Sequence, residues 1–170
     1  MKKISTLILG FLMIGSLQLS AQEDKSTRPS PPKTEKGNIG DVMVTIEYSS
    51  PSVKGREIFG GLISFDKIWR AGANEATTIE FSKDVTINGE ELAAGKYAFF
   101  VTPKKEGDWT IIFNSQWEQW GAYKKDDAKD VLVTEASTSE IDNVEMLTYV
   151  VDENMIHLDW ATTRLSFEVK

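Results

Sequence analysis

Apolar side chains recur with a period of two along most of this chain, and that spacing limits the fold more than any other feature. Apolar residues alternate with polar ones over residues 42–48, 78–82 and 164–170. Because successive side chains of a strand point to opposite faces, this pattern is typical of strands with one buried face. About nine such segments at short spacing predict an all-β fold, a single antiparallel β-sandwich with a jelly roll as one possible topology.

The connections between these segments agree with that fold. Asn88-Gly89 predicts a two-residue hairpin, because a type I′ turn requires positive φ at both central residues. Residues 152–154 form a similar short connection between two strand segments. Only residues 56–64 and 124–130 lack the alternation, and we expect one or two short helical turns there.

The N-terminal residues are typical of an export signal. Residues 1–21 combine two lysines, an apolar stretch and small residues before Gln22, which predicts a cleaved signal peptide and a periplasmic or extracellular protein. Residues 22–40 are polar and rich in proline, which predicts a flexible tether. The folded domain is therefore expected over residues 41–170, and no later segment is apolar for long enough to span a membrane.

Charge and composition exclude several classes of function. The net charge of −7 disfavours nucleic acid, whose phosphates require clustered basic side chains. With no cysteine and one histidine, His157, the chain cannot assemble a zinc site, so no metal is predicted. The acidic run at residues 126–130 lacks the spacing of an EF-hand loop, and no phosphate-binding glycine loop is present. No cofactor is predicted, and His157 is expected to be an exposed polar side chain.

The stretch WRAGANEATT, residues 69–78, mixes charged side chains with small ones. Its alanines and glycine allow the backbone to lie close against another surface while Arg70, Asn74 and Glu75 project from it. A guanidinium, an amide and a carboxylate on one tight loop predict a site for a polar ligand, and Trp69 could add a stacking face.

A structural role would explain the same residues. Arg70 and Glu75 could pair with each other, or with Arg56 and Asp66, to hold the loop against the sheet. Buried charges persist only when they are paired and hydrogen-bonded, so such a network requires no ligand.

A second cluster, QWEQWGAY, follows the strand segment WTIIFN. Its Trp117, Trp120 and Tyr123 could form a platform for sugar rings at the rim of a sandwich. We favour the other role of such aromatics, in which they close the end of the core.

Several ordered phrases of the chain resemble one known family. They are YSSPSVKGREIFGGLI, IWRAGANEATTIEFSKDVTINGEELAAGKYAFF, WTIIFN and QWGAYKKDDAKDV. Together they are similar to the bacterial exported family known as domain of unknown function 2911. The resemblance implies a secreted or periplasmic β-rich domain with no established reaction or ligand. The residues that recur in that family fall here on Arg56, Trp69, Arg70, Asn74 and Glu75, and on Trp120, Gly121 and Tyr123.

Three functions follow as hypotheses. The first is a non-enzymatic module that binds a carbohydrate or a small anion. The second is a hydrolase in which Glu75 acts as acid or base and Arg70 stabilises developing negative charge. The third is a structural or partner-binding domain without a ligand, and the sequence leaves the oligomeric state open. The predicted ligand-binding residues are Arg56, Trp69, Arg70, Asn74, Glu75, Trp120 and Tyr123.

Overall fold

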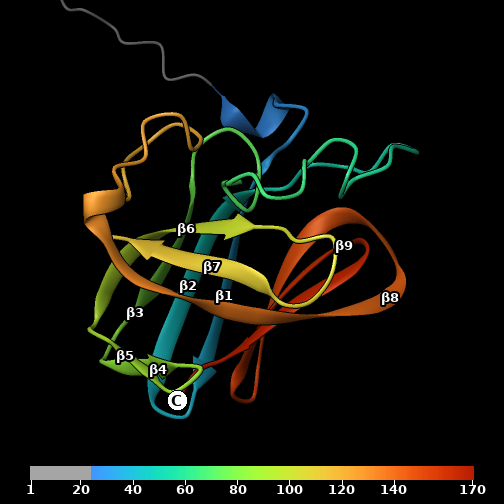
Figure 1. The fold of residues 1–170 in the computed structure, drawn as a ribbon. Helices are drawn as coiled ribbons and strands as arrows, with labels where there is room; N and C mark the ends of the chain where they lie inside the picture. Colours follow the sequence, from blue (N-terminus) through green and yellow to red (C-terminus); the bar gives the residue numbers. More distant parts are fainter. Residues whose placement is uncertain (1–23) are drawn as a thin grey trace, which may run out of the picture.

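The structure is a computed structural model that describes residues 24–170 (Figure 1). The predicted signal peptide over residues 1–21 lies outside the described residues. The elements are two 3-10 turns, η1 (Lys25–Thr27) and η2 (Asp127–Lys129), and the strands β1 (Pro32–Ile39), β2 (Val42–Ser49), β3 (Thr77–Phe81), β4 (Val85–Ile87), β5 (Glu90–Leu92), β6 (Gly95–Thr102), β7 (Trp109–Asn114), β8 (Asp130–Asp152) and β9 (Met155–Glu168).

All strand pairs are antiparallel, which confirms the predicted all-β fold. Seven strands form one sheet in the order β1-β2-β3-β6-β7-β8-β9, and β4 and β5 form a second, small sheet. The large sheet curls until β1 approaches β8, so it is nearly closed and barrel-like (Figure 1). At this closure Gly37 of β1 lies so near β8 that a Cβ atom would be 2.6 Å from Cβ of Val151. The two walls of this curled sheet enclose the core.

Strand β1 corrects one prediction. The flexible tether expected over residues 22–40 is wrong for its second half, because Pro32–Ile39 pairs with β2 along its whole length. Ile39 is the only buried residue of β1, so the sequence of this strand shows almost no alternation of apolar and polar side chains. Its backbone hydrogen bonds to β2 and the turn at Gly40 make it a strand, and its one proline, Pro32, fits the first position of an edge strand.

The core lies inside the curled sheet and follows the predicted alternation. Val44 and Ile46 of β2 are fully buried, and the outward residues between them are not. Aromatic rings from different strands meet at the centre, where Phe99 lies 5.2 Å from Phe113 and 5.5 Å from Phe167 between ring centroids. Burying large aromatic rings removes much apolar surface from water, which stabilises the fold without disulfides.

The predicted turns are confirmed. Asn88 and Gly89 have φ values of 51° and 87°, as a type I′ turn requires, and they connect β4 to β5. Glu153, with φ of 46°, lies in the two-residue connection between β8 and β9. Residues 124–130 contain η2, a single helical turn as expected, whereas residues 56–64 form turns instead of a helix.

Three irregular segments gather at one end of the molecule. Figure 1 shows η1, the β2–β3 connection and the β7–β8 connection at that end, and the β4–β5 hairpin at the opposite end. The sequence phrases predicted to carry function lie in these connections. Within residues 24–170, no helix has the length and apolarity that crossing a membrane requires.

Candidate functional site

Trp69 lies in the core, so it cannot form a stacking wall for a ligand. Its side chain is 6% exposed and stacks on Trp160 with ring centroids 5.8 Å apart. Its indole nitrogen donates a hydrogen bond to the carbonyl of Gly72 at 3.0 Å. A Cβ atom on Gly72 would lie 2.8 Å from Oγ1 of Thr77 and 3.1 Å from the carbonyl of Ser49. The small residues of this loop therefore serve close packing.

Arg70 and Asn74 hold the loop together through its backbone. Nη1 of Arg70 donates to the carbonyl of Asn74 at 2.6 Å, and the guanidinium lies 5.5 Å from the ring centroid of Tyr123. Asn74 has φ of 58°, a left-handed conformation that asparagine tolerates well. Its side-chain amide donates to the carbonyl of Ser30 at 3.0 Å.

The ion pairs by which Arg70 and Glu75 were predicted to hold the loop against the sheet do not form. Arg70 contacts a backbone carbonyl and not the carboxylate of Glu75. Arg56 donates to the carbonyls of Val53 and Ser52 in its own loop. Asp66 pairs with Lys104 at 2.9 Å. The structure therefore separates Arg56 from the other predicted residues.

Glu75 is paired, but with residues that precede the sheet. We call residues 24–31 the strap. Its Lys25 lies 2.8 Å from Oε1 of Glu75, and Nη1 of Arg28 lies 3.1 and 3.0 Å from the two carboxylate oxygens. Partial burial raises the pKa of Glu75, but the hydrogen bonds from Lys25, the backbone and Arg28 outweigh it and lower the pKa to about 2. Glu75 is therefore ionised at neutral pH and has no proton to give as a general acid.

The aromatic cluster lies at the surface, so the core-closing role favoured above is wrong. Trp117, Trp120 and Tyr123 are 38%, 55% and 82% exposed. Their loop is anchored instead by Ala122, which packs on a small apolar cluster formed by Ala76, just before β3, and by residues of β6 and β7. Each exposed ring has a cation over it: Lys96 on Trp117, Arg28 on Trp120 and Arg70 on Tyr123.

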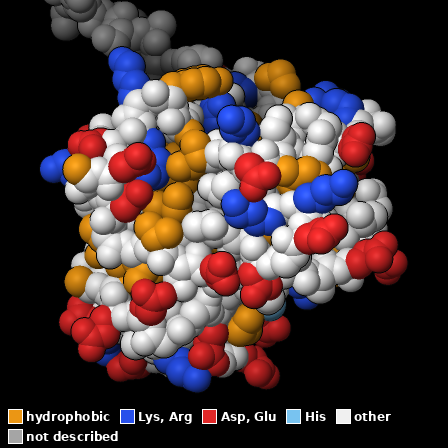
Figure 2. Space-filling view, viewed as in Figure 1, with side chains coloured by type: hydrophobic (Ala, Val, Ile, Leu, Met, Phe, Trp, Pro, Cys, Tyr) orange, Lys and Arg blue, Asp and Glu red, His pale blue; other side chains and the backbone are white. Residues whose placement is uncertain are grey.

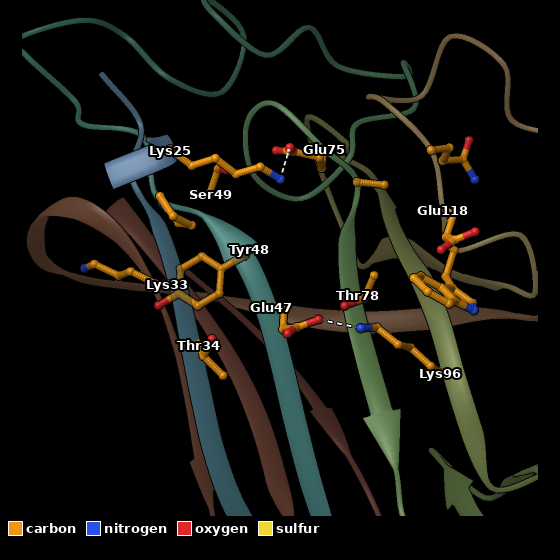
Figure 3. Close-up of a pocket in the computed structure, with 14 residues that line it drawn as sticks. Lys25, Lys33, Thr34, Glu47, Tyr48, Ser49, Glu75, Thr78, Lys96 and Glu118 are labelled. Atoms are coloured by element: carbon orange, nitrogen blue, oxygen red, sulfur yellow. Dashed lines mark hydrogen bonds and ion pairs between the residues drawn. The ribbon is translucent and has the colours of Figure 1, made fainter. Parts of the chain in front are cut away.

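A groove of about 500 Å³ runs beside this cluster, on the outer face of the sheet. Glu47 and Thr78 are partners in the β2–β3 register and form part of its floor. Lys96 reaches across β3 to pair with Glu47 (Figure 3). Figure 3 also shows Lys25 and Glu75 meeting at one end of the groove. A groove of this size accommodates a small ligand.

Two polar atoms of the groove have no hydrogen-bond partner among the described residues. They are Oγ1 of Thr78 and Oε1 of Gln119, and both atoms are buried. A buried polar atom without a partner costs stability, and most such atoms in folded proteins are paired. Both side chains line the groove beside Trp117. Nε1 of Trp160 in the core has the same status, so a buried atom without a partner is not by itself a sign of a ligand.

Charge in the groove is balanced. Three lysines and three glutamates line it, and Figure 2 shows acidic and basic side chains interspersed with exposed hydrophobic ones on one face of the molecule. A balanced lining gives little net attraction for an ion of either sign. Sequence reasoning missed the groove residues Glu47, Thr78, Lys96 and Gln119. Their only signal was a position on the polar face of a predicted strand or in the aromatic loop.

The family model described as "Protein of unknown function (DUF2911)" matches residues 30–169. The chain belongs to this family. The matched range begins just before β1, in agreement with the place of that strand in the sheet. Neither a curated protein nor a solved structure matches the chain.

In this DUF2911 domain a lysine ammonium group lies between carboxylates of the acidic run at residues 126–130. Lys125 has a buried side chain whose ammonium lies 2.8 Å from Asp127 and 2.6 Å from Asp130. Burial lowers the pKa of Lys125, but the hydrogen bonds to the two aspartates outweigh it and raise the pKa above its usual value. Among residues 24–170 no cluster of acidic or histidine side chains could hold a metal ion.

His157 of the DUF2911 domain is half-buried and not exposed as expected. Its Nδ1 lies 2.7 Å from the hydroxyl of Ser166 on the same hairpin. Burial lowers the pKa of His157, the charge of Arg164 lowers it further, and the carboxylates of Asp159 and Asp152 oppose this. Arg164 is itself held by Asp159 through two hydrogen bonds of 2.7 and 2.6 Å. These contacts give His157 a structural role.

Proposed function

We propose that this protein is exported and that it binds a neutral saccharide, without catalysis, in the groove beside Trp117. The observation that carries the proposal is the groove itself, in which the partly exposed indole of Trp117 borders polar side chains. The carboxylates of Glu47 and Glu118 accept hydrogen bonds only. A ligand that hydrogen-bonds to these groups must carry donors.

This requirement separates the two ligand classes that the sequence suggested. A small anion such as phosphate offers mainly acceptor oxygens, which match the carboxylates of the groove poorly. A saccharide hydroxyl donates and accepts, so it matches both the carboxylates and the ammonium groups that line the groove. The balanced charge of the groove also favours a neutral ligand over an anion.

Trp117 supplies the apolar surface that a sugar ring requires. Its indole is partly exposed, borders the groove and is held in place by Lys96, 4.7 Å from the ring centroid. Stacking on an aromatic ring combines burial of apolar area with a fixed orientation. The floor formed by Glu47, Lys96 and Thr78 adds hydrogen-bonding groups for the ring hydroxyls.

The hydrolase hypothesis receives no such support from Glu75. A carboxyl with a pKa of about 2 is a poor general base at neutral pH and is not protonated to act as an acid. Its oxygens are also engaged by Lys25 and Arg28. The groove therefore supports binding better than acid-base chemistry at this residue.

Isothermal titration calorimetry with cellotetraose, chitotetraose and inorganic phosphate tests the proposal. We expect a tetrasaccharide to bind and phosphate not to bind. Trp117→Ala should weaken binding by about tenfold, which corresponds to about 1.4 kcal/mol. Tyr123→Ala is the matched control, because Tyr123 lies on the same loop, is more exposed and does not line the groove.

Two results would contradict this function. Failure of both tetrasaccharides, and of cellobiose and chitobiose, to bind would leave the structural or partner-binding hypothesis in its place. Equal loss of affinity in the Trp117 and Tyr123 variants would show that the groove is not the site.

A further inference from the structure

The strap, residues 24–31, is held on the domain by polar contacts at several points. Lys25 and Arg28 engage the carboxylate of Glu75. Asn74 donates to the carbonyl of Ser30, and the amide of Ser50 donates to the carbonyl of Pro31 at 2.9 Å. In the three side-chain contacts, the partner lies between 44 and 50 residues further along the chain.

The strap forms one end of the groove. Lys25 and Glu75 both line the groove, and their ion pair lies at that end (Figure 3). Beyond this pair lies Trp120, whose backbone is bridged to that of Glu75 and whose ring lies 5.7 Å from the guanidinium carbon of Arg28. A ligand that extended past Trp117 toward Trp120 would have to displace Lys25 and Arg28.

The contacts of the strap are of a kind that a ligand can displace. None of its residues is fully buried, so little apolar burial holds it in place. The side chain of Lys25 is 53% exposed, and exposed ion pairs contribute little to stability because water and salt screen them. Arg28 is 13% exposed, so its pair with Glu75 is screened less and is the stronger of the two contacts. A ligand that binds only the open form shifts the population toward that form.

We propose that the strap is a displaceable end wall, which limits the closed groove to short saccharides and gives way to longer ones. In the open form Trp120 becomes a second stacking platform beside Trp117, and Glu75 becomes available to ligand hydroxyls. This inference rests on the function proposed above. It assigns Trp117 and Trp120, two tryptophans on one loop, to two adjacent subsites of one groove.

The rate of trypsin cleavage measures how tightly the strap is held when no ligand is present. The protease must bind the side chain of Lys25 to cut the Lys25–Ser26 bond, so the pairing with Glu75 protects that bond. In the full chain, Glu75→Gln should raise the rate of this cleavage by about fivefold or more, as fits a strap held mainly by charge. The control is Glu80→Gln, which removes the same charge from an exposed position on β3 that lines no part of the groove.

Saccharides of two lengths test the competition. Arg28→Ala, at a strap residue that does not line the groove, should bind cellotetraose or chitotetraose about fivefold more tightly than the wild type, because the strap is displaced more easily. Its affinity for cellobiose or chitobiose should match that of the wild type. Lys36→Ala is the control for charge, since this lysine is exposed and does not line the groove.

The outcomes separate this inference from the proposed function. If trypsin cleaved Glu75→Gln at the wild-type rate, the proposal that Glu75 holds the strap in place would be overturned, whatever the saccharide results. An equal affinity gain for disaccharide and tetrasaccharide, or no gain for either, would overturn its control of ligand length. Absence of saccharide binding by every variant would overturn the proposed function and the competition with it, while the cleavage rates would still decide whether Glu75 holds the strap.

Discussion

The indole rings of Trp69 and Trp160 are stacked inside the curled sheet, with centroids 5.8 Å apart and planes inclined by 20°. Phe59 meets both rings edge to face. The tryptophan of the WRAGANEATT phrase is thus a core residue, whereas Trp117 and Trp120 of the QWEQWGAY phrase lie at the surface. The sequence suggested a ligand-stacking role for Trp69 and a core-closing role for the aromatics of QWEQWGAY. In the structure the two roles are reversed.

Trp69→Ala tests this exchange by stability. Removing a buried tryptophan should lower the free energy of unfolding by about 3–5 kcal/mol, because the ring's contacts are lost and a cavity remains. Trp120→Ala should cost no more than about 1 kcal/mol, the worth of an exposed cation–π contact. Urea unfolding followed by circular dichroism measures both. Equal costs would contradict the assignment of Trp69 to the core.

Gly72→Ala should destabilise the domain although Ala71 and Ala73 flank it. The added methyl would meet Thr77 and the carbonyl of Ser49, and such overpacking costs about 1–3 kcal/mol. Ala73→Ser, at a partly exposed neighbouring position, should change stability by less than about 0.5 kcal/mol. If the two variants unfolded at the same urea concentration, close packing would not explain the glycine.

Lys125→Met should cost about 3 kcal/mol, because it leaves Asp130 without its cation in a largely buried position. Asp130 keeps a hydrogen bond from Asn114 at 2.7 Å, which places the cost at the low end of the usual range. The double variant Lys125→Met/Asp130→Asn should recover part of the loss in a double-mutant cycle. Calcium should leave the Tm of the wild type unchanged, since the ammonium of Lys125 occupies the acidic run. A Tm raised by calcium would contradict this account.

His157 should make stability depend on pH near neutrality. Its pKa is lower in the folded protein than the ordinary value of 6.5, so the unfolded chain binds a proton more readily. Its contribution to stability is therefore fully present above about pH 6.5 and is lost as the pH falls toward the folded-state pKa. His157→Gln should remove this slope between about pH 7 and pH 5, as measured by urea unfolding. The single histidine also gives one assignable NMR titration, and a midpoint above 6.5 would contradict the prediction.

Local sequence determined the strands and turns of this protein. The alternation that buries Val44 and Ile46 in β2 arises from the two-residue period of any strand. The turn at Asn88-Gly89 follows from the ease with which those two residues adopt positive φ. Such preferences act between near neighbours, so they can be predicted without knowing the rest of the fold.

Tertiary structure decided which strands pair at the edges and which side chains meet. Residues 32–39 carry no apolar pattern, and only their hydrogen bonds to β2 make them a strand. Glu75 finds Lys25, 50 positions away, and Glu47 finds Lys96, 49 positions away, so no local rule could supply either pair. Trp117 and the polar side chains beside it likewise become a candidate site only where sheet and loop enclose a groove. The cause is physical: the partner of a charge or hydrogen-bonding group depends on distance in space, which the curl of the sheet sets.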